Sequence, residues 1–266
     1  MKARDYAAAV ARVAPRAARK ARLAREERLV FVVGCPRSGT TFLGAALGSQ
    51  PGFVDLDEVT PWKAALPSSP GPAELRRILE RVRLLGLATG LRGVEQTPET
   101  AFSLEAALAA YPDALAVHAL RDGRDVVCSL LERGWFSSAR GGADDAGLAY
   151  GPHARFWVEP ERREEFERAS EARRCAWAWR RYVSAARETS CKLQLASRVL
   201  ELRYETLAGE AERLAAFLGS EPAPLHRALD GFRPDSVGRW RRDLDAGQLA
   251  DVEAEAGALL AELGYA

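Results

Sequence analysis

Residues 29–47 constrain the fold more than any other part of the chain. The segment opens with the apolar and β-branched run Leu29-Val-Phe-Val-Val33, which is typical of a buried strand. A loop bounded by Gly34 and Gly39 follows, and then the apolar start of a helix at about 40–49. In such a strand–loop–helix unit, successive backbone N–H groups and the helix N-terminus form a binding site for a phosphate.

The loop departs from the phosphate loop of nucleoside triphosphate enzymes at one informative position. Gly34, Gly39 and Thr41 match the pattern G-x-x-x-x-G-K-[ST], but Thr40 stands where the lysine belongs. That lysine normally reaches the terminal phosphates. Here the cation lies inside the loop instead, as Arg37. The sequence therefore predicts phosphate binding, but not of the kind found in ATPases.

A second segment has the same organisation. Residues 114–120 are predicted to form a strand, and the helix after it begins with Asp122 as N-cap and Asp125 as the partner in a capping box. Arg121 ends the strand and Ser129 lies two turns into the helix, so both can reach one anion. Two anion sites at the carboxyl ends of two strands suit a nucleotide with phosphates at both ends of its ribose.

These motifs resemble those of a known family. Pro36-Arg-Ser-Gly-Thr-Thr-Phe42 resembles the 5′-phosphosulfate loop of sulfotransferases that use 3′-phosphoadenosine-5′-phosphosulfate (PAPS), and Arg121 with Ser129 resembles their 3′-phosphate motif. Three further stretches are similar to the family's middle and C-terminal signatures: Glu95-Gln-Thr-Pro98, Leu202-Arg-Tyr-Glu205 and Ser236-Val-Gly-Arg-Trp240. The resemblance runs from about residue 29 to the C-terminus, with the motifs in the family's order.

The resemblance implies an α/β fold, with a P-loop-type central parallel sheet flanked by helices in a single domain. It implies transfer of a sulfuryl group from PAPS to a hydroxyl acceptor, with PAP as the product and no metal. The residues it assigns to nucleotide binding are Pro36, Arg37, Ser38, Gly39, Thr40, Thr41, Phe42, Arg121, Ser129, Tyr204, Gly238, Arg239 and Trp240. Two alternatives stay open for the aromatic residues: Phe42 can serve core packing, and Trp240 can form a surface cation–π pair.

Two catalytic roles follow. Arg37, a fixed guanidinium inside the loop, neutralises charge on the leaving phosphate. The acceptor hydroxyl needs a base, and Glu58 lies where protein-tyrosine sulfotransferases and many bacterial relatives carry a glutamate after the loop. Asp57 is the alternative base. The three histidines are weaker candidates, since His118 lies in a predicted buried strand.

One departure from the family concerns Gln96. Relatives often carry lysine there, and glutamine brings a hydrogen-bond donor without charge. Either another cation, such as Lys63 or Arg92, compensates, or the motif only shapes the pocket. Two other classes therefore stay open: a P-loop kinase or nucleotidase, and a nucleotide-binding relative without catalytic activity.

The chain divides into three predicted parts. Residues 1–27 form a basic helical extension, residues 28–266 form the sulfotransferase domain, and residues 134–160 form a mobile, aromatic-rich substrate lid, which includes Trp135 and Phe136. A third strand is predicted at 199–204. Further helices are predicted at 73–88, 101–110, 161–190, 208–218, 222–231 and 246–263.

Composition excludes some partners. The 38 Lys and Arg residues balance 37 Asp and Glu, so no nucleic-acid partner is expected. No apolar run is long enough to span a membrane, and membrane contact is not expected. The four cysteines lack paired spacing, which predicts a reduced, cytoplasmic protein without a zinc site. The acceptor is left as a hydroxyl-bearing small molecule, sugar, lipid or peptide tyrosine, and an oligomer stays possible.

Overall fold

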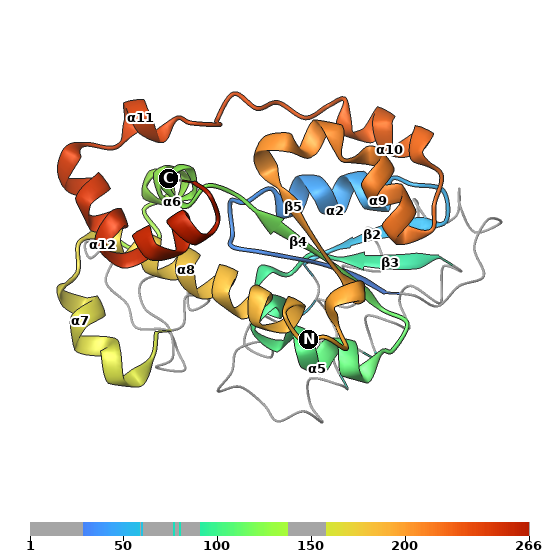
Figure 1. Ribbon diagram of the computed structural model, residues 1–266, viewed down its shortest axis with the longest axis horizontal. Coiled ribbons are helices and arrows are strands. Elements are labelled where there is room, and N and C mark those ends of the chain that lie inside the picture. Colours follow the sequence, from blue (N-terminus) through green and yellow to red (C-terminus); the bar gives the residue numbers. More distant parts are fainter. Residues whose placement is uncertain are drawn as a thin grey trace, which may run out of the picture.

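A five-stranded, fully parallel sheet forms the centre of the protein (Figure 1). In spatial order its strands are β2 (Phe53–Asp57), β3 (Arg92–Glu95), β1 (Val30–Val33), β4 (Leu115–Leu120) and β5 (Val199–Arg203). The predicted α/β class with a central parallel sheet is therefore confirmed. The three predicted strands are β1, β4 and β5, whereas β2 and β3 are absent from the sequence-based prediction.

The computed structural model describes residues 29–58, 60, 77, 80, 91–137 and 158–265. The predicted extension at 1–27 lies outside these residues, as does almost all of the helix predicted at 73–88. Of the predicted lid, only 134–137 and 158–160 are described. Phe136 is fully buried there, with its ring centroid 6.2 Å from that of Phe166, so it packs in the core rather than in a lid.

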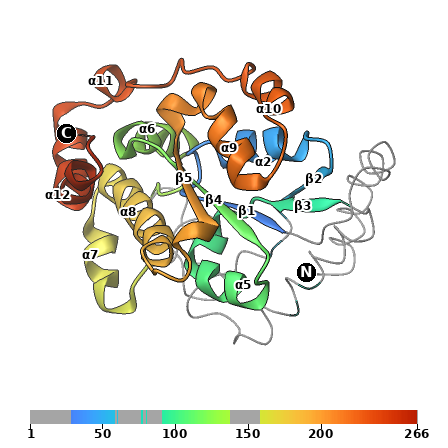
Figure 2. The same cartoon turned by 45° about the vertical axis from the view of Figure 1, so that its right-hand side comes forward.

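Strand β1 separates two layers of helices, because its side chains alternate between the two faces of the sheet. Phe31 and Val33 face a core built with α5 (Leu104–Ala110), α6 (Gly123–Arg133), α8 (Glu171–Ser190) and α12 (Ala246–Glu262). Val30 and Val32 face a second core built with α2 (Thr40–Gly48), α9 (Ala211–Leu218) and α10 (Pro222–Leu229) (Figure 2). Every residue of β1 is buried, as its continuous apolar sequence predicts.

Two predicted helices are interrupted. The one expected at 161–190 consists of the short helices η3 (Pro160–Arg162) and α7 (Arg163–Arg168), followed by α8. The break has a local cause, because the Ser170 side chain accepts a hydrogen bond from the backbone N–H of Arg173 and caps α8. The helix expected at 101–110 is η1 (Pro98–Ser103), a 3₁₀ segment, followed by α5.

The remaining short elements adjoin longer ones. They are η5 (Tyr204–Gly209), which continues directly from the strand, and α11 (Trp240–Asp243), which precedes α12. A further 3₁₀ turn, η4 (Ala196–Arg198), leads into β5. The loop between α10 and α11 runs along the carboxyl edge of β4 and β5 and is central to the site described next (Figure 1).

The sheet order places the two predicted anion-binding loops side by side. β1 and β4 are neighbours, with Val33 in register with His118, so the loops that follow them leave the same edge of the sheet. From β1 the chain turns to β2 and β3 on one side, whereas β4 and β5 lie on the other. In parallel α/β sheets, ligands bind where the strand order reverses in this way.

Candidate functional site

The loop after β1 adopts a tight, partly left-handed conformation. The Ser38 N–H donates to the Cys35 carbonyl at 3.0 Å, and both Arg37 (φ 77°) and Gly39 (φ 92°) have positive φ angles. A Cβ on Gly39 would lie 2.7 Å from the Tyr204 ring, so glycine is required there by space as well as by φ. Gly39 is the N-cap of α2, and the N-terminus of that helix is directed at the site.

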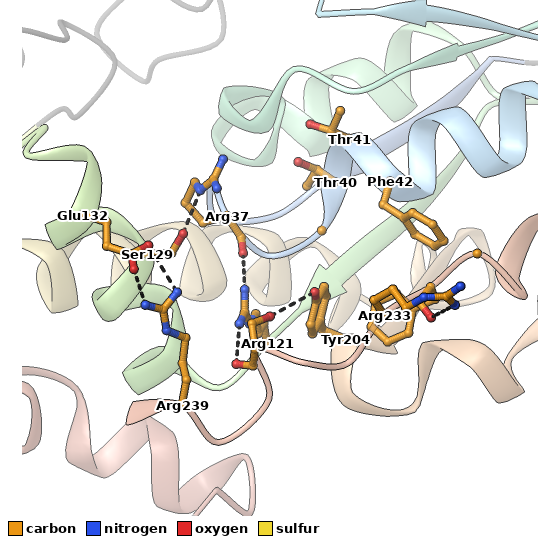
Figure 3. Close-up of a pocket in the computed structure, with 14 residues that line it drawn as sticks. Arg37, Thr40, Thr41, Phe42, Arg121, Ser129, Glu132, Tyr204, Arg233 and Arg239 are labelled. Atoms are coloured by element: carbon orange, nitrogen blue, oxygen red, sulfur yellow. Dashed lines mark hydrogen bonds and ion pairs between the residues drawn. The ribbon is translucent and has the colours of Figure 1, made fainter. Parts of the chain in front are cut away.

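Arg37 connects this loop to the second predicted motif. Its Nε donates to Ser129 Oγ at 2.9 Å, and Arg121 Nη1 donates to the Arg37 carbonyl at 3.0 Å (Figure 3). Burial lowers the pKa of Arg37, and the positive charges of Arg133 and Arg121 lower it further. A non-glycine residue held at positive φ among other cations is the kind of strain found at functional sites.

Arg121 is almost fully buried, with 4% of its surface exposed. Its Nη2 donates to the Ser236 carbonyl at 2.9 Å, and its guanidinium lies 4.3 Å from the centroid of the Tyr204 ring. Its Nε has no hydrogen-bond partner within the described part of the chain, and the same is true of the buried Ser38 hydroxyl. Buried donors without partners are costly, and an anion would satisfy them.

These groups belong to one pocket of about 440 Å³. Its described lining is Arg37, Gly39, Thr40, Thr41, Phe42, Arg121, Ser129, Glu132, Tyr204, Gly231, Phe232, Arg233, Ser236 and Arg239. Nine of the residues predicted to bind nucleotide are therefore brought together, from four separate stretches of sequence. Pro36, Ser38, Gly238 and Trp240 are not among the described lining residues, nor is Glu58.

The pocket is strongly cationic. Its ionisable side chains, apart from the Tyr204 phenol, are four arginines (Arg37, Arg121, Arg233, Arg239) and, among the described lining residues, a single acid, Glu132. Arginine guanidinium groups bind phosphate through paired hydrogen bonds. This arrangement, together with the helix N-terminus, favours a ligand with more than one negative group.

An aromatic cluster forms one wall of the pocket. The ring centroids of Phe42 and Phe232 are 5.4 Å apart, and those of Tyr204 and Phe232 are 4.7 Å apart. Phe42 thus contacts both the second core and the pocket, so core packing and a binding role coexist at this residue. Such rings offer a surface for a planar base.

Five lining residues were not assigned to the site from the sequence. They are Gly231, Phe232 and Arg233 in the loop after α10, Ser236 at the start of the C-terminal signature, and Glu132 on α6. The loop residues carried a usable signal, because an aromatic and an arginine stand between a glycine and a proline directly before the C-terminal motif. Glu132 follows Ser129 by three residues and therefore shares its helix face. That spacing was a second usable signal.

The loop that carries Arg239 is attached to α6 through Asp125. Asp125 is fully buried, and its carboxylate accepts hydrogen bonds from the backbone N–H groups of Gly238 at 2.7 Å and Trp240 at 3.0 Å. The predicted capping box at Asp125 is therefore wrong, because the carboxylate faces this loop rather than the start of its own helix. The N-cap is correct, since the Asp122 side chain accepts from Arg124 N.

Trp240 packs against two arginines. The guanidinium carbons of Arg124 and Arg241 lie 4.1 Å and 4.5 Å from the centroid of a Trp240 ring. The cation–π alternative for this residue is thus present in the structure. Gly238, two residues earlier, has φ 72°, a conformation that glycine adopts without strain.

Glu205, from the motif at 202–205, connects the end of β5 to the loop between β4 and α6. Its Oε1 accepts from the Asp122 N–H at 2.8 Å, and its Oε2 accepts from the Tyr265 hydroxyl at 3.1 Å. Burial raises the pKa of Tyr265, so this phenol stays protonated and donates. The motif therefore positions the start of α6, next to the Tyr204 side chain that lines the pocket.

Glu58 is an exposed residue directly after β2. Its neighbour Asp57 has φ 66° at an irregularity in the pairing of β2 with β3. Gln96, only 2% exposed, donates from Nε2 to Asp57 Oδ1 at 3.1 Å. The residue that replaces the family's lysine therefore holds an acid next to Glu58.

Arg92 does not compensate for the missing lysine. It begins β3, at the opposite end of the strand from Gln96, and donates to the Leu218 carbonyl at 2.6 Å. Lys63, the other cation considered, lies outside the described residues. Glu95, by contrast, is fully buried beside Gln96 and accepts hydrogen bonds from the Thr60 and Thr97 N–H groups at 3.2 and 3.0 Å.

Two other kinds of feature are absent from the described residues. No group of three or more His, Cys, Asp or Glu side chains in this part of the chain is placed to hold a metal ion. Among the described helices, none combines the length and apolar character needed to cross a bilayer.

Solved sulfotransferase structures resemble the chain over most of its length. A sulfotransferase domain from the curacin biosynthetic pathway matches with a TM-score of 0.58 at 14% identity, over 89% of this chain and 98% of that one. The sulfotransferase domain of the Synechococcus PCC 7002 olefin synthase gives 0.51 at 16%, over 87% and 94%. A Mycobacterium tuberculosis H37Rv sulfotransferase gives 0.52 at 17%, over 94% and 81%. The chain has the sulfotransferase fold.

The sequence-based resemblance is thus confirmed at the level of the fold. No protein-family model matches the sequence, and no curated protein matches it. At identities of 14–17%, the reaction of a protein with the sulfotransferase fold has to be argued from its own site.

Proposed function

We propose that the protein transfers a sulfuryl group from PAPS to a hydroxyl acceptor. The observation that carries this proposal is the hydrogen bond from Arg37 Nε to Ser129 Oγ at 2.9 Å. It joins the loop after β1 to α6, the helix after β4, in one arginine-rich pocket. A nucleotide with phosphates at both ribose positions, 5′ and 3′, uses both loops at once.

The residues present fit such a nucleotide. The 5′ group would bind the loop at 36–41, where the buried Ser38 hydroxyl lacks a partner among the described residues and Thr40 and Thr41 add hydroxyls. The 3′-phosphate would bind Arg121, Ser129 and Arg239, and the Arg121 Nε supplies a buried donor for it. Phe42 and Tyr204 would contact the base. Pro36, Gly238 and Trp240 would act by shaping the two loops.

The bound nucleotide supplies the sulfuryl group, and the protein supplies position and charge. Arg37 neutralises the negative charge that grows on the leaving phosphate, which lowers the barrier because the guanidinium is already in place. Its lowered pKa still leaves an arginine charged at neutral pH. Glu58 accepts the proton of the acceptor hydroxyl, and Asp57, held by Gln96, is the alternative base. No metal ion is needed in this scheme.

The acceptor is proposed only as a class. A hydroxyl-bearing small molecule, sugar, lipid or peptide tyrosine fits a mechanism in which a carboxylate removes the hydroxyl proton. A screen of these four acceptor classes with labelled PAPS identifies the class by transfer of the label.

The donor is tested by calorimetry with PAP and with ATP, each with and without Mg²⁺. We expect PAP to bind tightly without Mg²⁺ and ATP to bind far more weakly, because the loop carries Arg37 and no lysine after Gly39. Arg37→Ala should weaken PAP binding by roughly 1.5–3 kcal/mol for each charge-assisted hydrogen bond that it removes. Tight, Mg²⁺-dependent ATP binding would support a kinase or nucleotidase instead, and PAP binding without transfer to any acceptor would support a non-catalytic relative.

A further inference from the structure

Glu132 is an acid in a pocket otherwise built for anions. It lies three residues after Ser129 on α6, on the same helix face, and lines the pocket beside Arg239 (Figure 3). Acidic side chains in an anion site reduce its affinity through repulsion, so this residue requires a physical explanation.

Glu132 forms a two-point ion pair with Arg239. Arg239 Nη1 donates to Glu132 Oε2 at 3.2 Å, and Arg239 Nη2 donates to Glu132 Oε1. These hydrogen bonds hold the pKa of Glu132 below its usual range, and the charge of Arg37 acts in the same direction. The carboxylate is therefore ionised and engages the same two guanidinium N–H groups that a phosphate would use.

We propose that Glu132 is an internal counter-ion that an anionic group of the ligand must displace from Arg239. This inference rests on the proposed function, in which the displacing group is the 3′-phosphate. Glu132 thereby sets the affinity for 3′-phosphorylated nucleotides, and keeps Arg239 paired while the pocket holds no ligand.

The contacts on the other side of Arg239 allow this exchange. Asp243, the last residue of α11, accepts a hydrogen bond at 2.6 Å from Nε of Arg239, the N-cap of that helix. Arg239 therefore keeps its hydrogen bond to Asp243, and with it its orientation, when the ligand displaces Glu132. The Glu132 side chain is 57% exposed against 18% for Arg239, so it can turn toward solvent while the arginine stays in place.

The test is PAP binding to Glu132→Gln, which keeps size and hydrogen bonding but removes the charge. We expect PAP to bind about tenfold more tightly, because one full repulsive charge is removed near the phosphate. The affinity for 5′-AMP, which lacks the 3′-phosphate, should change less than about twofold, since its single phosphate binds the other loop. Glu164→Gln is the matched control, because Glu164 forms an exposed ion pair with Arg168 on α7 and lies outside the pocket.

Glu132 can either compete with the ligand for Arg239 or hold Arg239 in its binding orientation, and these two roles predict opposite results. If Glu132 mainly orients Arg239, Glu132→Gln binds PAP more weakly or equally, and the proposal is overturned. In an Arg239→Ala background the benefit of Glu132→Gln should disappear, because no guanidinium remains for the two anions to share. A gain of the same size that persists without Arg239 also contradicts the proposal.

Binding of inorganic pyrophosphate distinguishes a failure of this inference from a failure of the proposed function. If wild-type protein fails to bind PAP but binds pyrophosphate, and Glu132→Gln tightens that binding, Glu132 is a counter-ion in a protein with another ligand. If neither PAP nor pyrophosphate binds more tightly to Glu132→Gln than to wild type, the inference fails, whatever the wild-type protein binds.

Discussion

The carboxylate of Asp125 accepts a hydrogen bond from the backbone N–H of Gly238 across 2.7 Å, and thereby fixes a loop 113 residues further along the chain. Its second oxygen holds the N–H of Trp240. Arg239 lies between these two anchored positions, so the position of its backbone depends on a residue outside the described lining of the pocket.

Asp125→Asn should therefore weaken PAP binding by about 1–3 kcal/mol, because the amide NH₂ faces a backbone donor that it cannot satisfy. Calorimetry with PAP and with 5′-AMP checks this, and the loss should be larger for PAP. Asp245→Asn is the control: Asp245 caps α12, where asparagine is an equally good N-cap, and neither ligand should be affected. An equal loss for both nucleotides would contradict a role for Asp125 in placing Arg239.

Arg121 and Ser129 are predicted to bind the 3′-phosphate. Arg121→Ala and Ser129→Ala should each weaken PAP more than 5′-AMP, because only PAP carries the group that these residues contact. A double-mutant cycle between either substitution and removal of the 3′-phosphate should give a coupling of about 0.5–3 kcal/mol. Zero coupling would mean that the two side chains support the fold of the loops only.

The base is tested with a pair of neighbouring acids. Glu58→Gln should lower turnover about 10²–10⁴-fold, since the amide cannot accept the acceptor's proton. PAP affinity should be nearly unchanged, because Glu58 is not among the described residues that line the pocket. Steady-state kinetics with PAPS and the identified acceptor measure turnover, and calorimetry with PAP measures the affinity.

Asp57→Asn is the comparison variant. If it abolishes turnover while Glu58→Gln remains active, the base is Asp57, positioned by Gln96. Full activity of both variants would remove the carboxylate base from the mechanism.

The cysteines should differ sharply in reactivity. Burial raises the pKa of Cys35, Cys175 and Cys128, the last to about 12, whereas Cys191 is exposed at the end of α8. Because the thiolate is the reactive form, a thiol reagent at a pH of about 8 should label one cysteine per native chain quickly. Mass spectrometry should locate the label on Cys191, and Cys191→Ser should abolish the fast phase. Rapid labelling of a second thiol would show that the core opens more readily than the structure implies.

Glu95 should make stability depend on pH. Burial raises its pKa, against the opposing effect of hydrogen bonds from Thr97 and Thr60. The folded protein therefore binds this proton more tightly than the unfolded chain does, and the free energy of unfolding falls as pH rises from the ordinary glutamate value through the raised one. Glu95→Gln removes the titration. Denaturant unfolding at several pH values should show that the wild type, relative to this variant, loses stability as the pH rises. A constant difference between the two proteins would show that the pKa of Glu95 is not shifted.

The sequence predicts those strands whose own residues carry a strand pattern, and it does not predict strands that form mainly through pairing with distant segments. β1 and β4 are mostly apolar and are followed by marked loops, so their type and their shared edge could be predicted. The prediction missed β2 and β3. Val54–Asp57 alternates apolar and acidic residues as a half-buried strand does, but the run is only four residues long, and Arg92–Glu95 contains a glycine and two charges. β3 forms a strand because it pairs with β2 on one side and with β1 on the other, and β2 pairs with β3 alone. This pairing is a tertiary effect.

The residues of the site also divide into those that local spacing predicts and those that it does not. Arg37, Arg121 and Ser129 could be predicted because each occupies a fixed offset from a strand end. Asp125 was misassigned, since its spacing from Asp122 matches a local cap and its true partners lie at 238–240. Phe232 and Glu132 were missed although their spacing from the motifs was a usable signal, and only the fold places the loop after α10 beside α6 in one pocket. Contacts between distant segments are the part that spacing alone cannot supply.

The pairing of β1 with β4 has a consequence for what the protein can distinguish. The two loops that are predicted to bind anions leave adjacent strands, whose backbones are held about 4.8 Å apart by the sheet's own hydrogen bonds. That separation does not depend on any side chain in the pocket. If these loops bind the proposed nucleotide, we expect substitutions at the arginines to change its affinity, whereas the distance between its two bound phosphates is set by the spacing of the strands.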